Sequence, residues 1–272
     1  MQKSVSSVLS FDFFRSNLML AFIFGVLLLI VLIALGNGLT GKVIEGPNSG
    51  LISHLKFDDG SGLTAIDSSG NSNSGSLVNN PSWTSGKFNG ALSFNGNNYV
   101  SLPGIYSLSS GTIGMWIYKI GAGSGNNVIT GSYGMQGNER APTFSFPGTG
   151  NGKIGWEFGS LTNKNTVAII GAGQWVHIAM TYDSNYNVKV YVNGTLDSSG
   201  TSVAPGAFFN QIHVGHYGNY GSHYFQGIID DVHIYNRALT ASEVRELYQS
   251  SASGITASAI ADTSAPIILT TK

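Results

Sequence analysis

Hydrophobic and polar residues alternate along most of the chain between about residues 50 and 235. A period of two places every second side chain on one face of an extended backbone, which is typical of half-buried β-strands. Asn193-Gly194 separates two such runs, 187–192 and 195–196, and this dipeptide favours a tight hairpin turn. The other predicted strands are 51–57, 91–94, 99–102, 112–119, 127–130, 143–146, 153–158, 166–170, 174–182, 211–215 and 228–235.

Short strands at this spacing, with almost no helical periodicity, predict an all-β protein built as a two-sheet antiparallel jelly-roll sandwich. One short C-terminal helix is predicted over residues 241–249, because Thr240 and Glu243 have the spacing of a capping box. Val244, Leu247 and Tyr248 share one face of this helix. We expect that face to close one end of the sandwich.

Residues 18–35 form a separate segment without a charged or polar side chain. As a helix it would span ~27 Å, close to the ~30 Å hydrocarbon thickness of a bilayer. Lys3 and Arg15 precede it, which predicts a single N-terminal transmembrane helix with a cytoplasmic N-terminus and an extracellular remainder. Ala34-Leu35-Gly36 is a small-x-small triplet, so a cleaved signal peptide and a secreted protein are the alternative.

The predicted organisation combines this segment with the strand pattern. Residues 37–49 are Gly-rich and lack periodicity, and the last residues are rich in Ser, Ala and Thr, as linkers are. The predicted parts are a cytoplasmic tail at 1–17, a transmembrane anchor at 18–36, a stalk at 37–49, a β-domain at 50–250, and a linker or the start of a further repeat at 251–272.

The chain carries few charges. Asp, Glu, Lys and Arg make up 10% of its 272 residues, and the formal net charge is −1. Binding to nucleic acid depends on a surface rich in Lys and Arg, so this composition excludes nucleic acid as a partner. Cysteine is absent, which excludes disulfides, cysteine-based zinc sites and a thiol nucleophile.

Three groups of motifs follow one another along the chain. The first is GLISHLKFDDGSG at 50–62, DSSGN at 67–71 and GKFNGALSFNG at 86–96; the second is GQWVHIAMTYD at 173–183 with KVYVNG at 189–194; the third is GIIDDVHIYNRAL at 227–239. Together they make residues 50–250 resemble the laminin G-like, concanavalin A-like jelly-roll domains of microbial surface proteins. The superfamily includes lectins, carbohydrate-binding modules, adhesion modules and some glucanases, so function has to be argued from the site.

The glutamates argue against a hydrolase. Retaining glucanases of this fold carry Glu-x-Asp-x-x-Glu along one strand, which holds the two catalytic carboxyl groups ~5 Å apart. No glutamate of this chain outside the apolar segment has an aspartate two positions further on, and no Gly-x-Ser-x-Gly elbow occurs. We therefore predict a protein that is not an enzyme.

Two loops combine aromatic and polar residues in the way that sugar-binding sites do. An aromatic ring can stack on the apolar face of a pyranose, while Asn and Arg bind hydroxyl groups. The alternative is that Tyr217 or Tyr224 merely packs beneath its own loop. Trp116 and Trp175, in contrast, lie inside predicted strands and are expected in the core. The candidate carbohydrate-binding residues are Tyr133, Asn138, Arg140, Tyr217, Tyr220 and Tyr224.

Calcium is the cofactor that the resemblance implies. Asp230 stands at a position where the C-terminal strand of the family often meets a structural calcium ion, and Gly-Asn loops can supply further oxygen ligands. The candidate ligands are Asp58, Asp67, Asn71 and Asp230.

The same residues could instead serve purely structural roles. Asp67 and Asn71 could cap a turn by Asx hydrogen bonding, and Asp230 or Asp231 could pair with Lys56 or Arg237. Zinc is less favoured, because the pair His213 and His216 lacks a third ligand in the sequence.

These observations predict a membrane-anchored, extracellular, lectin-like module that binds a polysaccharide or glycan without catalysis. The alternative is an adhesion domain or structural spacer at the cell surface that contacts protein, and a glycoside hydrolase comes third. The membrane is the second predicted partner, through the N-terminal helix. Further domains or surface proteins could also associate with the chain.

Overall fold

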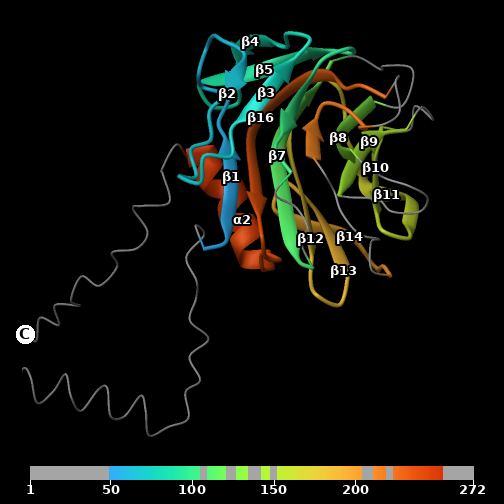
Figure 1. Cartoon of the computed structure of the whole chain (residues 1–272). Helices are drawn as coiled ribbons and strands as arrows, with labels where there is room; N and C mark the ends of the chain where they lie inside the picture. The colour runs from blue at the N-terminus through green and yellow to red at the C-terminus, as the bar shows by residue number, and fades with distance from the viewer. Residues whose placement is uncertain are drawn as a thin grey trace, which may run out of the picture. The chain divides into compact units, whose positions relative to one another are not determined.

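Two antiparallel β-sheets face each other across one hydrophobic core (Figure 1). The computed structural model describes residues 49–104, 109–120, 127–133, 142–147, 152–203, 211–218 and 223–253. The predicted tail, transmembrane helix and most of the stalk lie outside these residues, as does the linker from residue 254 onwards. In the part of the chain that is described, no helix combines the length and the hydrophobicity that crossing a membrane requires.

The first sheet, sheet A, has eight strands, and its long strand β16 (Gln226–Tyr235) pairs with three others. One edge of β16 pairs with β7 (Gly111–Lys119); the other edge pairs first with β5 (Gly90–Asn95) and then with β1 (Leu51–Leu55). Beyond β7 the sheet continues with β12 (Trp175–Tyr182), β13 (Asn187–Val192) and β14 (Thr195–Thr201). Beyond β5 it ends with β4 (Ser82–Ser85).

The second sheet, sheet B, also has eight strands. Its order is β11 (Leu161–Ile169), β10 (Lys153–Phe158), β9 (Thr143–Phe146), β8 (Asn127–Tyr133), β15 (Gln211–Val214), β6 (Tyr99–Leu102), β3 (Gly75–Val78) and β2 (Thr64–Ala65). Alternation along these strands sends one set of side chains inward; Phe144, Trp156 and Ile212, for example, belong to the shared core.

The predicted C-terminal helix is confirmed as α2 (Ala241–Ser253), and it begins at the predicted capping box. The Thr240 N–H donates to Glu243 Oε2 at 2.7 Å, and the Glu243 N–H donates to Thr240 Oγ1 at 3.3 Å. Val244 and Leu247 pack with Tyr235 in a second apolar cluster. The helix thereby buries the outer face of part of sheet A.

The strand predictions hold where hydrophobic alternation is strong. The observed bounds of β6, β9, β10 and β13 are the predicted ones, and the other predicted strands differ at their ends. Three strands rich in Gly, Ser and Thr, which are β2, β3 and β4, were not predicted because they lack alternation.

The two strand tryptophans differ from the expectation. Trp116 is buried, but it stacks on Tyr248 of α2 at 5.4 Å between ring centroids, outside the shared core. The prediction that Trp175 lies in the core is wrong: it is half-buried and packs against Tyr118 at 5.5 Å, because both stand on the outer face of sheet A.

We predict that Phe144→Ala lowers the free energy of unfolding by about 3–5 kcal/mol, because the ring is fully buried between the sheets and its loss leaves a cavity. Val167→Ala is the control, since Val167 is 72% exposed on β11, and its effect should stay within about 0.5 kcal/mol. Urea unfolding of both variants measures the difference, and similar values for the two would contradict the placement of the core.

Candidate functional site

The predicted tyrosine loop leaves β15 and folds back on itself. His216 and Tyr224 form an isolated antiparallel bridge, and the Tyr217 N–H donates to the His223 carbonyl at 3.2 Å. The Phe225 N–H donates to the Gly215 carbonyl at 2.9 Å. Backbone hydrogen bonds therefore hold both stems of the loop.

Four rings gather beside this loop, and we call them the ring cluster: Tyr99, His213, His216 and Tyr224. Tyr224 stacks on His216 with 4.1 Å between ring centroids and an interplanar angle of 21°. Tyr99 comes from β6, far away in sequence, and its centroid lies 4.5 Å from His213 and 4.9 Å from His216. The two histidines are 3% and 5% exposed, whereas both tyrosines are half-buried. The histidines thus form a buried base beneath two partly exposed tyrosine side chains.

The ring cluster lies on the outer face of sheet B. Val100 and Leu102 of β6 belong to the core. Side chains alternate along a strand, so Tyr99, which precedes Val100, points to the other side. His213 is likewise flanked by the core residues Ile212 and Val214.

Tyr217 crosses the neighbouring strand β8 at close range. A Cβ added to Gly131 would lie 3.0 Å from Tyr217 Cα, so glycine lets the loop approach the strand closely there. Tyr133 follows two residues later in β8 and pairs in register with Gln211 of β15. The structure therefore brings the two predicted sugar-binding segments together at β8.

Parts of the prediction fall where the structure gives no description. Asn138, Arg140 and Tyr220 lie outside the described residues, as does the side chain of Tyr133. Of the predicted residues, the structure places Tyr224 in the ring cluster with Tyr99, His213 and His216. Tyr217 lies beside His223 and Gly131 instead. Sequence reasoning missed Tyr99, although its place in the alternation of β6 opposite Val100 signals an outward ring.

His213, at the base of the cluster, is neutral at pH 7. Burial lowers the pKa of His213 to about 4, and the nearby His216 lowers it further in the same direction. The Nδ1 atoms of the two rings lie 3.4 Å apart. No third His, Asp or Glu among the described residues joins them within ligand distance, so the pair serves as a stacking base.

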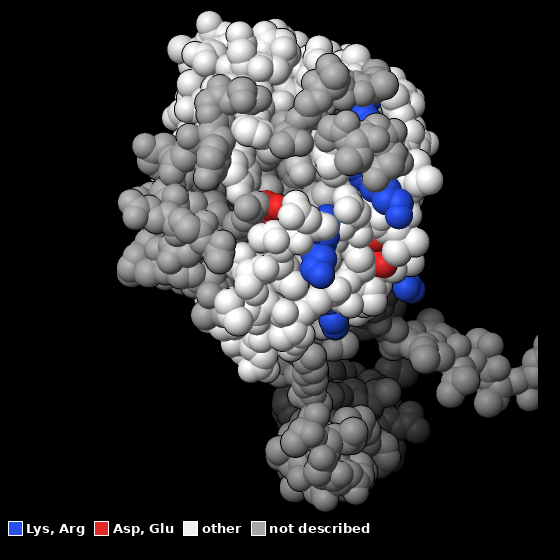
Figure 2. Space-filling view, turned by 90° about the vertical axis from the view of Figure 1, so that its right-hand side faces the viewer, with Lys and Arg blue, Asp and Glu red and all other residues white. Residues whose placement is uncertain are grey.

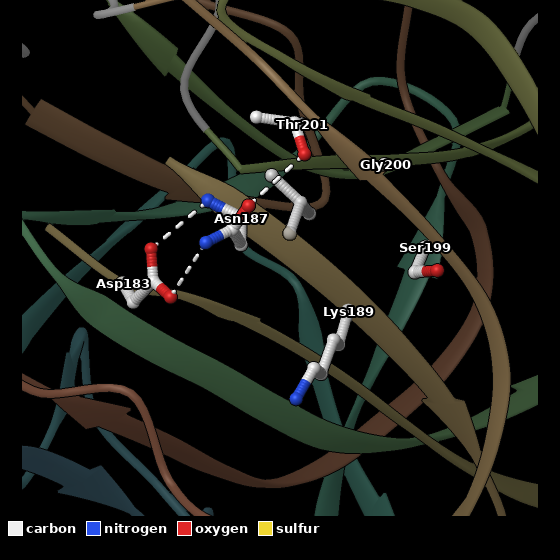
Figure 3. A pocket seen from close by; sticks show the side chains of 7 residues that line it. Asp183, Asn187, Lys189, Ser199, Gly200 and Thr201 are labelled. Atoms are coloured by element: carbon white, nitrogen blue, oxygen red, sulfur yellow. Dashed lines mark hydrogen bonds between the residues drawn. The ribbon is translucent and has the colours of Figure 1, made fainter. Parts of the chain in front are cut away.

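A polar groove of about 310 Å³ lies elsewhere, at the ends of β13 and β14 (Figure 3). The Asp183 carboxylate accepts hydrogen bonds from the backbone N–H groups of Asn185 and Asn187 and from Asn187 Nδ2, at 2.9–3.0 Å. The bonds from Asn187 are the main reason why the pKa of Asp183 is lowered. Thr201 Oγ1 donates to Asn187 Oδ1 at 3.0 Å. These groups satisfy one another and present no aromatic face, so the ring cluster is the better sugar platform.

Charge is sparse on the face that is turned to the viewer in Figure 2. Its Lys and Arg side chains stand apart among uncharged residues, and no basic stripe crosses the described part of this face. Such a surface suits a neutral ligand better than a polyanion.

Two of the four candidate calcium ligands flank a single turn, residues 86–90. Asp58 Oδ1 accepts a hydrogen bond from the Gly90 N–H at 2.8 Å, and Asp230 Oδ2 accepts one from the Phe88 N–H at 2.9 Å. Asp230 is fully buried, and its Oδ1 has no hydrogen-bond partner among the described residues. A Cβ on Gly86 would lie 2.6 Å from Asp230 Oδ2 and would collide with the Gly90 carbonyl oxygen. The carboxylate and this carbonyl therefore converge on the same side of the turn.

Burial raises the pKa of Asp230 to about 8, and the negative charges of Asp231 and Asp58 act in the same direction. The hydrogen bond from the Phe88 N–H opposes this rise. A divalent cation bound at Oδ1 would relieve the cost of an ionised, buried carboxylate. The donor set consists of oxygens, which fits calcium.

Asp67 and Asn71 belong to a separate network at β1. Asp67 accepts hydrogen bonds from the N–H groups of His54, Ser69 and Asn73 and from Ser69 Oγ, at 2.8–2.9 Å. Its bond to the Ser69 N–H is an Asx turn, and Asn71 Nδ2 donates to the Leu51 carbonyl at 2.8 Å. The Asx-turn interpretation thus accounts for Asp67, whereas Asn71 instead ties the loop to β1.

The predicted pairing partners differ from the observed ones. Asp231 Oδ1 lies 2.6 Å from His54 Nε2, and Arg237 Nη2 lies 2.7 Å from Glu243 Oε1. Arg237 thereby ties the start of α2 to the end of β16.

The sequence profile of a known family matches residues 94–245, more than half of the chain. The chain belongs to the concanavalin A-like lectin/glucanases superfamily. No curated protein matches it in sequence.

Solved structures with this concanavalin A-like fold include a domain that holds an oligosaccharide. Domain 4 of AbnA, an extracellular arabinanase of Geobacillus stearothermophilus in complex with arabinotriose, is 25% identical, with a TM-score of 0.55 over 73% of this chain and 98% of that one. The binding domain of Paraclostridial Mosquitocidal Protein 1 is 19% identical, with a TM-score of 0.58 over 75% of this chain and 53% of that one. Trypanosoma rangeli sialidase is 18% identical, with a TM-score of 0.61 over 74% of this chain. This chain spans only 33% of the sialidase, so that likeness concerns the fold.

The raised pKa of Asp230 predicts a specific pH dependence. The folded state holds a proton on this carboxyl up to a pH of about 8, whereas the unfolded state loses it near 3.8. In the presence of a chelator, the free energy of unfolding should therefore fall as the pH rises between these two values. Asp230→Asn removes the titration, so its stability should fall less over the same range. Thermal unfolding at pH 5.5 and 8.5 tests this, and parallel curves for the two proteins would refute it.

Proposed function

We propose that this concanavalin A-like domain is a carbohydrate-binding module. The observation that carries the proposal is the ring cluster, in which the half-buried Tyr99 and Tyr224 rest on a buried histidine base on the outer face of sheet B. Domain 4 of the arabinanase, with the same fold and 25% identity, binds arabinotriose and adds support.

In this proposal a sugar ring stacks on Tyr224 or Tyr99, and polar groups at β8 bind its hydroxyls. The stacking is prepared before the ligand arrives, because Tyr224 already lies against His216 and the loop stems are hydrogen-bonded. The neutral His213 keeps charge away from an uncharged ligand. Affinity at a single site of this kind is modest, so several sites on one polysaccharide would act together.

The proposed module does not catalyse a reaction. The chain lacks the Glu-x-Asp-x-x-Glu spacing that a retaining glucanase of this fold requires. The proposal also places the domain outside the cell, held at the membrane by residues 18–35, because that segment is apolar throughout.

We further propose that a calcium ion binds beside the 86–90 turn, with Asp230 Oδ1 and Asp58 as carboxylate ligands. The buried Oδ1 without a hydrogen-bond partner among the described residues supports this assignment. The ion would supply positive charge to a buried carboxylate and tie β16 to the end of β1. Asp67 and Asn71 are not among the proposed ligands, because Asp67 forms an Asx turn and Asn71 bonds to β1.

The carbohydrate proposal predicts that Tyr224→Ala weakens glycan binding about tenfold, because burying an aromatic face contributes roughly 1.5 kcal/mol or more. Tyr224→Phe is the matched control, since it keeps the ring and its stacking on His216 and should bind almost like the wild type. The measurement is affinity electrophoresis and calorimetry against arabinan oligosaccharides and a glycan panel. The full chain is used in a detergent without a sugar headgroup.

Two outcomes would count against the carbohydrate proposal. Equal binding by Tyr224→Ala and the wild type would remove the ring cluster as the site. Absence of binding by a folded wild-type chain would favour the adhesion or spacer alternative. Circular dichroism establishes that each variant is folded.

The calcium proposal predicts that calcium raises the melting temperature of the wild type and not that of Asp230→Asn. At a hundredfold excess over the dissociation constant, binding would contribute about 2.7 kcal/mol. Asp67→Asn is the matched control: it weakens the Asx turn but should keep the response to calcium. The same calcium response in Asp230→Asn and the wild type would eliminate this site.

A further inference from the structure

Three side chains meet on sheet A where β1 lies beside β16 (Figure 1), away from the ring cluster on sheet B. They are His54 of β1 and Asp231 and His233 of β16. One potential ligand atom from each lies within 4.8 Å of the other two. His54 Nε2 is 2.6 Å from Asp231 Oδ1, and His233 Nδ1 is 3.9 Å from Asp231 Oδ2.

Strand pairing explains why the three residues converge. His54 and His233 are register partners, and their rings stack with 3.8 Å between centroids and an interplanar angle of 23°. The register of β16 against β7 shifts between Asp230 and His233, and Asp231 has a φ of 53°. This β-bulge brings the Asp231 carboxylate to both imidazoles.

The surroundings favour a cation. The side chains of His54, Asp231 and His233 are only 17%, 12% and 9% exposed, so water screens the carboxylate weakly.

We propose that His54, Asp231 and His233 bind a divalent transition-metal ion, with Zn²⁺ as the natural occupant, and that this ion clamps β1 to β16. Two imidazoles and one carboxylate are ligands of Zn²⁺ and Co²⁺, whereas Ca²⁺ and Mg²⁺ prefer oxygen alone. Water completes the coordination, because His54 retains an exposed edge. The site is therefore distinct in chemistry from the oxygen site at Asp230.

Binding requires a small rearrangement. Tetrahedral Zn²⁺ holds its ligand atoms about 3.3 Å apart, since metal–ligand distances are about 2.0–2.1 Å. The contact between His54 Nε2 and Asp231 Oδ1 must open, and that between His233 Nδ1 and Oδ2 must close. His233 Nδ1 also lies 3.1 Å from the Asp231 carbonyl, to which it donates its proton. A neutral imidazole carries one ring proton, so metal binding at Nδ1 requires the tautomer with that proton on Nε2. The proton moves from Nδ1 to Nε2 by exchange with solvent, and none is released overall.

The test uses the full chain in detergent, without a histidine tag and stripped of metal with EDTA. Zn²⁺ is titrated by calorimetry, and Co²⁺ is followed by its visible absorption. We expect one equivalent of metal, the absorption of a tetrahedral Co²⁺ complex, and a higher melting temperature with Zn²⁺. His54→Gln and His233→Gln should each weaken Zn²⁺ binding at least tenfold.

Two further variants locate the metal. His223→Gln is the matched control, because His223 belongs to the tyrosine loop, and it should bind Zn²⁺ like the wild type. Asp231→Asn keeps a hydrogen-bonding group beside His54 and should still weaken binding, which keeps the test decisive if a histidine variant fails to fold. The proposal is overturned if the wild type binds no Zn²⁺. It is also overturned if Asp231→Asn and His54→Gln bind as tightly as the wild type, or if only His223→Gln loses binding.

Discussion

The pairing of β16 is the interaction on which the rest of this structure depends. One edge of this strand holds β7, and the other holds β5 and then β1, so segments from both ends of the described domain meet on one backbone. From Ile229 onward its residues are buried on both faces. The shared core covers the inner face, and α2 covers the outer face at Tyr235. A slip of one residue in this register would exchange those faces and expose both clusters.

The bulge in β16 follows from the same pairing. Its partner on one edge changes from β5 to β1, and the register shift with Asp231 at a φ of 53° lies at this change. Two acidic residues stand next to each other there, and each meets a different environment. The N–H groups of the 86–90 turn face Asp230, while imidazoles face Asp231. The proposed calcium and zinc sites therefore lie next to each other. They differ in their donor atoms, which are oxygens alone at Asp230 and include imidazole nitrogens at Asp231.

The fold could be predicted from the local alternation of hydrophobic and polar residues. The site could be predicted only in part, because its residues are brought together by pairing between strands distant in sequence. Alternation gave β6, β9, β10 and β13 their observed bounds, whereas β3 and β4 are too rich in Gly, Ser and Thr to show it. Composition pointed to Tyr217 and Tyr224. It could not reveal that β6 pairs with β15 and so carries Tyr99 to His213, because such a contact depends on sheet order.

The ring cluster combines a strand with a loop, and this division bears on recognition. Tyr99 and His213 stand on paired strands, so the sheet fixes their positions. Tyr224 belongs to a loop, yet stacking on His216 restrains its ring before any ligand is present. Because the ring is already restrained, it loses little side-chain entropy when a ligand binds. Only 10% of the residues are charged, so Coulombic attraction contributes little to binding. Affinity must then come from ring faces and neutral hydrogen bonds, and specificity from the loop residues that surround them.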